Sequence, residues 1–440
     1  MPHPKLQLST NKAEPLVMHI DLNSCFATVE QQARPLLRGK PIGVTNRLTK
    51  NACVVAASYE AKALGVKVGM TFSEAKLLVP NLIMLETDPP KYHYVYQILV
   101  NIMRSYSPNI VMKSIDEGII NFEGTTAIVN KRPPRRIVGA PTGASGLEAI
   151  GHEIKKRLKD EVGCWMRCNI GIAPNRFLAK TAASLHKPDG LDIIDHTNLR
   201  QVLAKLELTD LTGIAERNQA RLNACGIYTA LQFLEAPADI LRRHVFKSIC
   251  GEDWYRRLRG WEVDDFDPLD SGSVKNVGRQ FVLDDMRPSE ETLRSRLAYL
   301  CETTAMKLRY KGLCARGVYI YLMYAGGDSW YERRMFKSTF FSNAEVYRRA
   351  TLLFNRRPQG DWVRMIAVSC YALAPSNISQ LSLLDEVNRE VWLTQAVDQI
   401  NSQFGEFTIT YASSLKAKDV VKQKIPFGST RYFELLLNRA

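Results

Sequence analysis

Three acidic residues that could bind metal ions lie in two short motifs far apart in the sequence. Asp21 follows the apolar run 16–18, and the pair Asp116 and Glu117 follows the apolar run 110–112. Short apolar runs are typical of buried strands, so we expect the acids at the ends of two neighbouring strands. Carboxylates gathered at one sheet edge repel each other unless a divalent cation holds them. The two motifs therefore predict a two-metal site for phosphoryl transfer.

Each motif also fits a simpler interpretation. An aspartate after a strand is usually a turn former or a helix N-cap, and an Asp-Glu pair is common on solvated loops. Asp116 and Glu117 are adjacent, and adjacent residues of a straight strand point to opposite faces. The metal-site hypothesis therefore predicts a bend in the strand at this pair.

Length and composition indicate a soluble, globular, multidomain protein. The chain has 440 residues, enough for roughly three or four domains, with 45% hydrophobic residues and a mean hydropathy of −0.18. The polar N-terminus lacks the apolar core of a signal peptide, and no apolar run is long enough to cross a bilayer, so we expect a cytoplasmic protein. The nine cysteines do not suggest a disulfide framework, and Cys164 and Cys168 are more simply explained as buried thiols than as zinc ligands.

The net charge of +14 and the pI near 9.3 indicate an acidic partner. Nucleic acid is the favoured partner, because no apolar helix of the membrane-surface type accompanies the basic residues. A generic basic surface is the alternative. The basic residues recur in the central and C-terminal regions, for example at 242–243, 256–259, 333–334 and 348–349.

The first half of the chain has a mixed α/β pattern, with a small module between the two acidic motifs. Periodicity predicts helices at 27–32, 92–106 and 147–159, and strands at 41–44, 52–57 and 168–173. Another helix begins at Phe177, and from Leu199 the pattern changes to short helices.

The segment 211–227 resembles a helix-hairpin-helix, whose glycine turn and helix N-terminus present backbone N–H groups to phosphates. Ala215 stands at a position usually taken by glycine, so an ordinary helical turn remains the alternative. Residues 264–273 are acidic, carry Pro and Gly, and are expected to form a linker. Beyond it, strand 280–283, helix 290–311, strands 318–324 and 330–340, helix 344–354 and strand 363–371 predict a β-α-β-β-α-β module.

Several segments match one family in their order and spacing: 20–26, 58–62, 114–117, 171–175, 178–180, 186–190 and 277–279. With them the chain resembles, over nearly its whole length, the Y-family translesion DNA polymerases of the DinB/UmuC group (DNA polymerase IV-like). The resemblance implies an α+β multidomain fold, the right-hand polymerase. Its expected parts are a ferredoxin-like palm (14–24 and 89–187), small fingers (25–88), a helical thumb with the helix-hairpin-helix (188–263), a linker (264–274), a β-α-β-β-α-β little finger (275–375) and a C-terminal tail (376–440).

The resemblance also implies catalytic roles for the acids. Asp21 and Asp116 would bridge two Mg2+ ions, with the Leu22 carbonyl as a further ligand. Glu117 would hold the ion that lowers the pKa of the primer 3′-hydroxyl, and the second ion would neutralise the triphosphate and the departing pyrophosphate.

Nucleotide, DNA and clamp contacts follow from the same resemblance. Phe26 matches the steric gate that excludes a ribose 2′-hydroxyl, with plain core packing as the alternative. The expected nucleotide-binding residues are Cys25, Phe26, Tyr59, Lys62 and Lys180, and the expected DNA-binding residues are Gly213, Ile214, Arg217 and Arg279. A segment resembling the bacterial sliding-clamp-binding peptide contains Gln380, Leu381, Leu383 and Leu384, with an amphipathic linker as the alternative.

The chain departs from the family pattern near the acids. Lys62 stands where the family usually has Arg, which removes a bidentate fork. Asn23 replaces a frequent Asp, Cys25 a frequent aromatic residue, and Ala56 a common hydroxyl residue. Residues 118–121 also differ from the frequent pattern, but none of these positions is an expected side-chain ligand.

The sequence therefore predicts a template-directed DNA polymerase of low fidelity that bypasses damaged template and has no proofreading segment. Its expected partners are primer-template DNA, dNTP and a sliding clamp, and we expect a monomer with no membrane contact. One alternative is a catalytically silent adaptor of the same family, against which the retained Asp21, Asp116 and Glu117 argue. Another is a palm-fold nucleotide cyclase, which would have no need of a basic thumb and little finger.

Overall fold

A five-stranded sheet, which we call the palm sheet, carries the acidic motifs. Its strand order is β5–β6–β1–β7–β8, so β1 lies in the middle and pairs antiparallel with both β6 and β7. The strands are β1 (Val17–Leu22), β5 (Ile110–Met112), β6 (Glu117–Asn121), β7 (Cys168–Ala173) and β8 (Leu191–Ile193). The structure is a computed structural model that describes residues 8–125, 146–263, 274–283, 285, 287–358, 360–376, 385–405 and 407–418.

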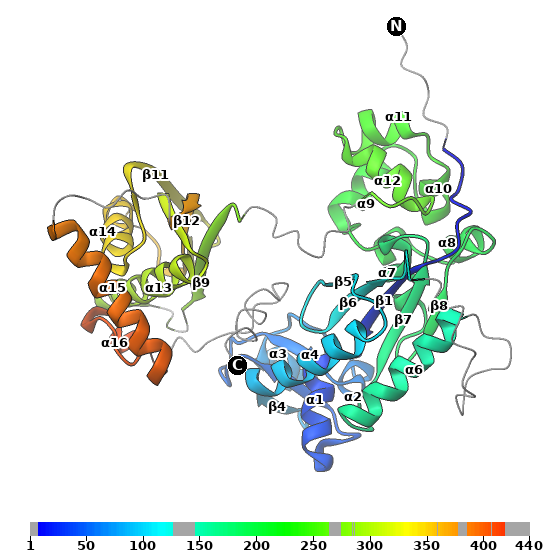
Figure 1. The fold of residues 1–440 in the computed structure, drawn as a ribbon, viewed down its shortest axis with the longest axis horizontal. Coiled ribbons are helices and arrows are strands. Elements are labelled where there is room, and N and C mark those ends of the chain that lie inside the picture. Colours follow the sequence, from blue (N-terminus) through cyan, green and yellow to red (C-terminus); the bar gives the residue numbers. More distant parts are fainter. Residues whose placement is uncertain are drawn as a thin grey trace, which may run out of the picture. The chain divides into compact units, whose positions relative to one another are not determined.

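Helices cover both faces of the palm sheet, and the alternation of β1 divides its side chains between them (Figure 1). Met18, Ile20 and Leu22 pack in one cluster with α4 (Pro89–Arg104) and α6 (Gly146–Glu161). Val17 packs in a second cluster with α7 (Arg176–Leu185). Because every second residue of a strand shares a face, Asp21 lies on the α7 face with Val17.

Helix α7 lies very close to the palm sheet at Gly171 of β7. A Cβ atom at this position would stand 2.0 Å from the carbonyl oxygen of Ala179 and 2.3 Å from the amide nitrogen of Ala183. Only glycine fits here. The close approach brings Lys180, on the same helix, within reach of the acids.

The small module between the acidic motifs, the predicted fingers, is built on a second sheet of order β3–β2–β4. Its elements are α1 (Cys25–Ala33), the short η1 (Pro35–Leu37), β2 (Ile42–Thr45), β3 (Val54–Ala57), α2 (Tyr59–Ala63), α3 (Phe72–Leu78) and β4 (Ile83–Glu86). The predicted strands 41–44 and 52–57 are confirmed as β2 and β3. The sequence does not predict β4, because its residues are only partly buried and show no clear alternation.

Short helices form the predicted thumb, as expected from residue 199 onward. They are α8 (Leu199–Leu203), η2 (Leu208–Asp210), α9 (Glu216–Asn223), α10 (Ala230–Glu235), α11 (Ala238–Ile240), η3 (Leu241–Val245) and α12 (Cys250–Leu258). Gly213 has a φ of 97° and forms the turn before α9, as a hairpin glycine requires. Phe233, Phe246 and Trp254 pack together in the thumb core.

The Asn175 side chain joins the thumb to helix α7. The Asn175 Oδ1 atom accepts a hydrogen bond from the Leu178 amide at 2.8 Å and so caps α7. Its Nδ2 atom donates to the carbonyl oxygens of Arg257 and Trp261, both at 2.9 Å. The end of α12 is therefore held at the beginning of α7.

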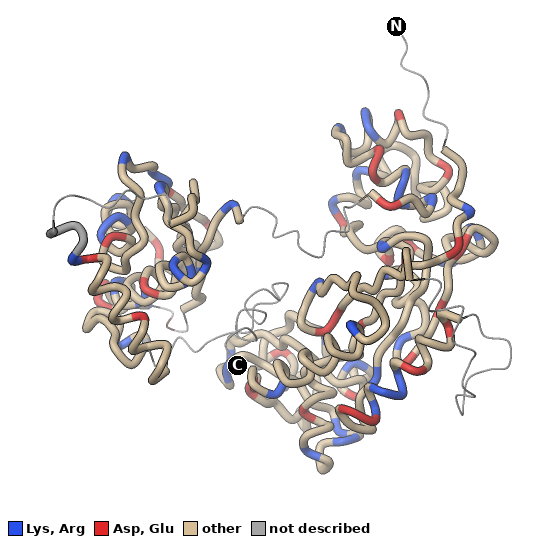
Figure 2. Tube along the Cα trace, in the orientation of Figure 1, with Lys and Arg blue, Asp and Glu red and all other residues tan. Residues whose placement is uncertain are grey.

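The second compact unit contains the described residues 274–418. Its sheet has the order β11–β10–β12–β9, and its elements are β9 (Asn276–Val282), α13 (Glu290–Tyr310), β10 (Leu313–Tyr324), β11 (Ser329–Phe340), α14 (Asn343–Phe354) and β12 (Val363–Pro375). This confirms the predicted β-α-β-β-α-β order. The predicted linker lies outside the described residues except for Val274. Lys and Arg residues are spread over the elements of both units (Figure 2).

A C-terminal segment packs on helix α13 of the second unit. It contains α15 (Asp385–Phe404), η5 (Ala412–Ser414) and α16 (Leu415–Lys418). The Phe407 ring stacks on Tyr299 with centroids 5.1 Å apart, and the Arg309 guanidinium makes two hydrogen bonds to the Asp398 carboxylate, at 2.6 and 2.7 Å. Residues 385–418 of the predicted tail are thus part of the little-finger unit.

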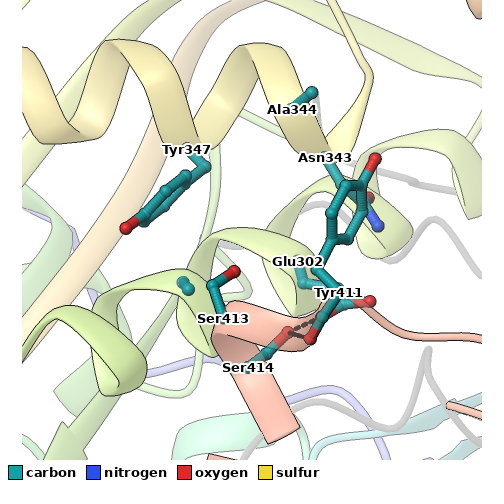
Figure 3. Close-up of a pocket in the computed structure, with 8 residues that line it drawn as sticks. Glu302, Asn343, Ala344, Tyr347, Tyr411, Ser413 and Ser414 are labelled. Atoms are coloured by element: carbon teal, nitrogen blue, oxygen red, sulfur yellow. Dashed lines mark hydrogen bonds between the residues drawn. The ribbon is translucent and has the colours of Figure 1, made fainter. Parts of the chain in front are cut away.

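The carboxylate of Glu302 is buried where this segment meets α13 (Figure 3). It accepts hydrogen bonds from the hydroxyls of Thr410, at 2.9 and 3.0 Å, and Ser414, at 2.5 Å. Burial raises the pKa of Glu302, and these hydroxyls offset the rise only in part. A cavity of about 240 Å³ lies beside it, lined by Ala298, Glu302, Asn343, Ala344, Tyr347, Tyr411, Ser413 and Ser414.

Glu302→Gln is expected to raise the melting temperature at pH 7.5 by a few degrees. Because the pKa of Glu302 is raised on folding, the protonated carboxyl contributes its full stability below the unfolded pKa, and this stability is lost as pH rises through the folded pKa. At pH 7.5 the ionised carboxylate therefore destabilises the folded state, and the neutral glutamine avoids this cost. The gain should therefore disappear at about pH 4, as calorimetry at several pH values would measure.

Glu291→Gln is the matched control, because the bond to Lys416 lowers the pKa of the exposed Glu291. This variant should lose stability at neutral pH, with the loss fading in acid. A Glu302→Gln variant less stable than wild type at pH 7.5 would refute the interpretation.

Candidate active site

The palm sheet brings the three acids together where β1 ends and β6 begins, and we call this place the acidic edge. Asp21 and Glu117 are direct partners across β1 and β6, and direct partners in an antiparallel pair share a face. Asp116 lies just before β6, in the bend that spans 113–116, and its carbonyl oxygen accepts a hydrogen bond from the Leu22 amide at 2.8 Å. The predicted bend is confirmed.

The strand beside β1 differs from the predicted one. We expected the run 110–112 to neighbour the Asp21 strand, but it forms β5 at the sheet edge and pairs with β6 instead. The chain turns back between them, with the Lys113 amide bonded to the Glu117 carbonyl at 3.0 Å. The expectation was wrong because a second strand, β6, follows β5 after a bend of only four residues, and β6 is the strand that pairs with β1.

The pKa values of Asp116 and Glu117 are shifted in opposite directions. Burial raises the pKa of Asp116, and the negative charges of Asp21 and Glu117 raise it further, although the Ser114 hydroxyl opposes the rise. Burial also acts to raise the pKa of Glu117. The interactions with His19 and Lys180 outweigh it and lower that pKa to about 2.

Two lysines pair with two of the three acids in this structure. The Lys180 Nζ atom lies 2.7 Å from Glu117 Oε2, and the Lys187 ammonium pairs with Asp21 Oδ2. Within the described residues, no three His, Cys, Asp or Glu side chains are assembled in a metal-holding arrangement. Each ammonium compensates one acid, and the repulsion on Asp116 persists. Carboxylate oxygens are hard donors of the kind that divalent cations bind, so the three acids are chemically suited to a metal ion.

The predicted triphosphate contacts divide between two places. Lys62 donates to the Ser24 hydroxyl at 2.7 Å and lies 4.9 Å from the Tyr59 ring centroid. Burial lowers the pKa of Lys62, and the nearby Lys187 lowers it further. Lys180 lies beside Glu117 instead. Lys187 joins Tyr59 and Lys62 near Asp21, and the nucleotide-binding role of Lys180 stays a prediction.

Lys187 belongs to the segment 186–190, which carries part of the family resemblance, but the resemblance implied no role for it. Its contact with Asp21 joins residues 166 positions apart, so no local pattern could reveal it. The signal that could have found it is a lysine in the turn between α7 and β8, because both elements adjoin the acidic edge.

Phe26 and Cys25 lie in the core directly after the first acidic motif. The Phe26 ring stacks on Tyr92 with centroids 4.3 Å apart, and the Tyr92 hydroxyl donates to Glu30 Oε1 at 3.0 Å. Burial raises the pKa of Cys25, and Asp116 and Asp21 add to the rise. Cys25 therefore lies near Asp116 and Asp21, whereas Phe26 packs on Tyr92, and the steric-gate role of Phe26 stays a prediction.

The predicted DNA contacts have different settings. Gly213 forms the thumb turn, the Ile214 side chain is buried in the thumb core, and Arg217 is exposed on α9. Arg279 belongs to β9 of the second unit and lies 5.7 Å from the Tyr299 ring centroid. The clamp-peptide residues Gln380, Leu381, Leu383 and Leu384 lie outside the described residues.

Among the helices that the structure describes, none has the length and apolar character to span a membrane.

Comparisons with known proteins agree in sequence and in fold. Residues 20–184 match the impB/mucB/samB family, and residues 274–383 match the C-terminal domain of that family. The chain is 31% identical over 412 residues to the DNA polymerase IV of Moorella thermoacetica, covering 92% of this chain and 97% of that protein. It is also 31% identical over 414 residues to the DNA polymerase IV of Pelotomaculum thermopropionicum, covering 93% and 97%.

Solved structures support the same fold. A Y-family DNA polymerase chimera (Dbh-Dpo4-Dbh) matches with a TM-score of 0.67 at 23% identity, over 81% of this chain and 98% of that one. A ternary complex of Dbh DNA polymerase matches over the same shares with a TM-score of 0.51.

Proposed function

The chain belongs to the impB/mucB/samB family, and we propose that the acids at the β1–β6 edge are the active site through which it extends a primer on a template. It is a DNA-directed DNA polymerase of the translesion type, a metal-dependent nucleotidyltransferase. The observation that supports the site is the pairing of Asp21 with Glu117 across β1 and β6, with Asp116 in the adjoining bend.

Two Mg2+ ions would be held by Asp21, Asp116, Glu117 and the Leu22 carbonyl. When bound, these ions would activate the primer hydroxyl and neutralise the departing pyrophosphate. The side chains around them have separate tasks. Tyr59, Lys62 and Lys187 lie near Asp21 and hold the triphosphate, because compact ammonium groups suit phosphate oxygens. Lys180, which pairs with Glu117, is a further triphosphate contact, because its ammonium has three donors.

Primer-template DNA is the macromolecular substrate. The exposed Gly213 would form the turn that faces the phosphates, and the buried Ile214 holds that turn through the hydrogen bond from its amide to the Leu211 carbonyl at 2.9 Å. Arg217 would add a charge beside the turn, and Arg279 would contribute from the second unit. We place this activity in the cytoplasm, where DNA and dNTP meet, and assign it to a monomer with a sliding clamp as its partner.

Asp116→Ala combined with Glu117→Ala should abolish primer extension, because two of the three acids are lost. We expect a fall of at least about 10³-fold, measured with Mg2+ on intact and lesion-bearing templates. DNA binding, followed by fluorescence anisotropy, should change little. Glu123→Ala, at an exposed acid just after β6, is the control, and extension that survives in the double variant would refute the site.

Phe26→Ala should raise ribonucleotide incorporation relative to deoxyribonucleotide incorporation, because the ring would no longer meet the 2′-hydroxyl. Val29→Ala, at another buried position of α1, is the control for lost packing. If both variants lose activity equally and keep the sugar preference of the wild type, Phe26 is a core residue only.

Leu383→Ala with Leu384→Ala should weaken association with the bacterial sliding clamp, because the peptide would bind through these two side chains. Leu393→Ala, at an exposed position of α15, is the control. Unchanged clamp affinity in a surface-plasmon measurement would make this segment a linker.

A further inference from the structure

Two buried amide side chains lie beneath the acidic edge, outside the roles described so far. Asn169 is the direct partner of Asp21 across β1 and β7, and Asn23 follows β1. Their exposed fractions are 0% and 2%. The Asn23 Nδ2 atom donates to Asn169 Oδ1 at 2.9 Å, so the two strands are joined by a neutral amide pair.

The remaining polar atoms of this pair hold one loop. Residues 186–190 connect α7 to β8. Asn23 Oδ1 accepts from the Asp189 amide at 2.8 Å, and Asn169 Oδ1 accepts from the Gly190 amide at 3.3 Å. Asn169 Nδ2 donates to the His186 carbonyl at 3.0 Å. Backbone groups on both sides of Lys187 are therefore fixed to the floor of the site.

The loop is also held from its outer side. The Asp189 carboxylate pairs with Lys155 at 3.2 Å and Lys159 at 3.0 Å, both on α6. A Cβ atom at Gly190 would stand 2.1 Å from the His186 carbonyl oxygen, which shows how tightly the loop is closed. Between these anchors, Lys187 extends to the Asp21 carboxylate.

We propose that Asn23 and Asn169 are positioning residues for the incoming nucleotide, because they fix the loop that presents Lys187 to the triphosphate. The pair acts on nucleotide affinity through Lys187 and not on the chemical step. This rests on the proposed function, which takes the phosphates to lie at Lys187. A long lysine side chain has many rotamers, so its reach is set by where its backbone is held.

The neutrality of the pair has a physical reason. A carboxylate at position 23 would add a negative charge two residues after Asp21. It would also lose the N–H group that binds Asn169 Oδ1. The Asn23–Asn169 pair supplies donors and acceptors to the loop without that charge.

The test is single-nucleotide insertion by the full chain carrying Asn169→Ala, Lys187→Ala or both. Each single variant should raise KM for dNTP about tenfold with kcat within about twofold of wild type. The double variant should resemble Lys187→Ala alone, because residues that act through one group are not additive. The Kd of dNTP for a complex with a dideoxy-terminated primer should follow the same pattern.

Asn169→Ser is the milder variant if Asn169→Ala fails to fold, and a smaller rise in KM is expected because its hydroxyl still accepts from Gly190. Multiplied effects in the double variant, or a fall in kcat and melting temperature with KM unchanged, would overturn the proposal while leaving the function intact. If Lys187→Ala itself leaves KM and Kd unchanged, the phosphate assignment and the positioning role both fail.

Discussion

Asp21 and Glu117 face each other across two hydrogen-bonded strands, and the repulsion between their carboxylates has to be compensated at the edge of the palm sheet. In this structure the compensation comes from Lys180 on α7 and Lys187 on the loop after it. Both lysines reach the acids because α7 packs closely on the sheet, where Gly171 has no side chain. The same charges that require a cation therefore also determine which elements must surround them.

The register of β1 decides whether this edge exists at all. Its odd-numbered positions carry Val17, His19 and Asp21 to the α7 face, and its even-numbered positions carry apolar side chains to the core under α4 and α6. A shift of one residue would bury Asp21 in that core and expose Ile20. The large apolar cluster beneath β1 thus stabilises the one register in which Asp21, Glu117 and Asn169 lie in a row across three strands.

Much of this could be predicted from the sequence, and the remainder depends on contacts between distant segments. Apolar runs and turn residues predicted β2, β3, β7 and the β-α-β-β-α-β order, because these patterns are local. The strand β6 was missed because it follows β5 after a bend of four residues. Lys187 and the docking of α15 were missed because Lys187–Asp21 and Arg309–Asp398 join residues far apart in the sequence.

If Asp21, Asp116 and Glu117 hold the catalytic ions, the number of ions bound must depend on these carboxylates. Electron paramagnetic resonance can count Mn2+ as a probe on a complex of the full chain with a dideoxy-terminated primer-template and matching dNTP. We predict two Mn2+ per complex for the wild type and fewer for Asp21→Asn, with unchanged DNA binding. An equal count for wild type and Asp21→Asn would contradict this prediction.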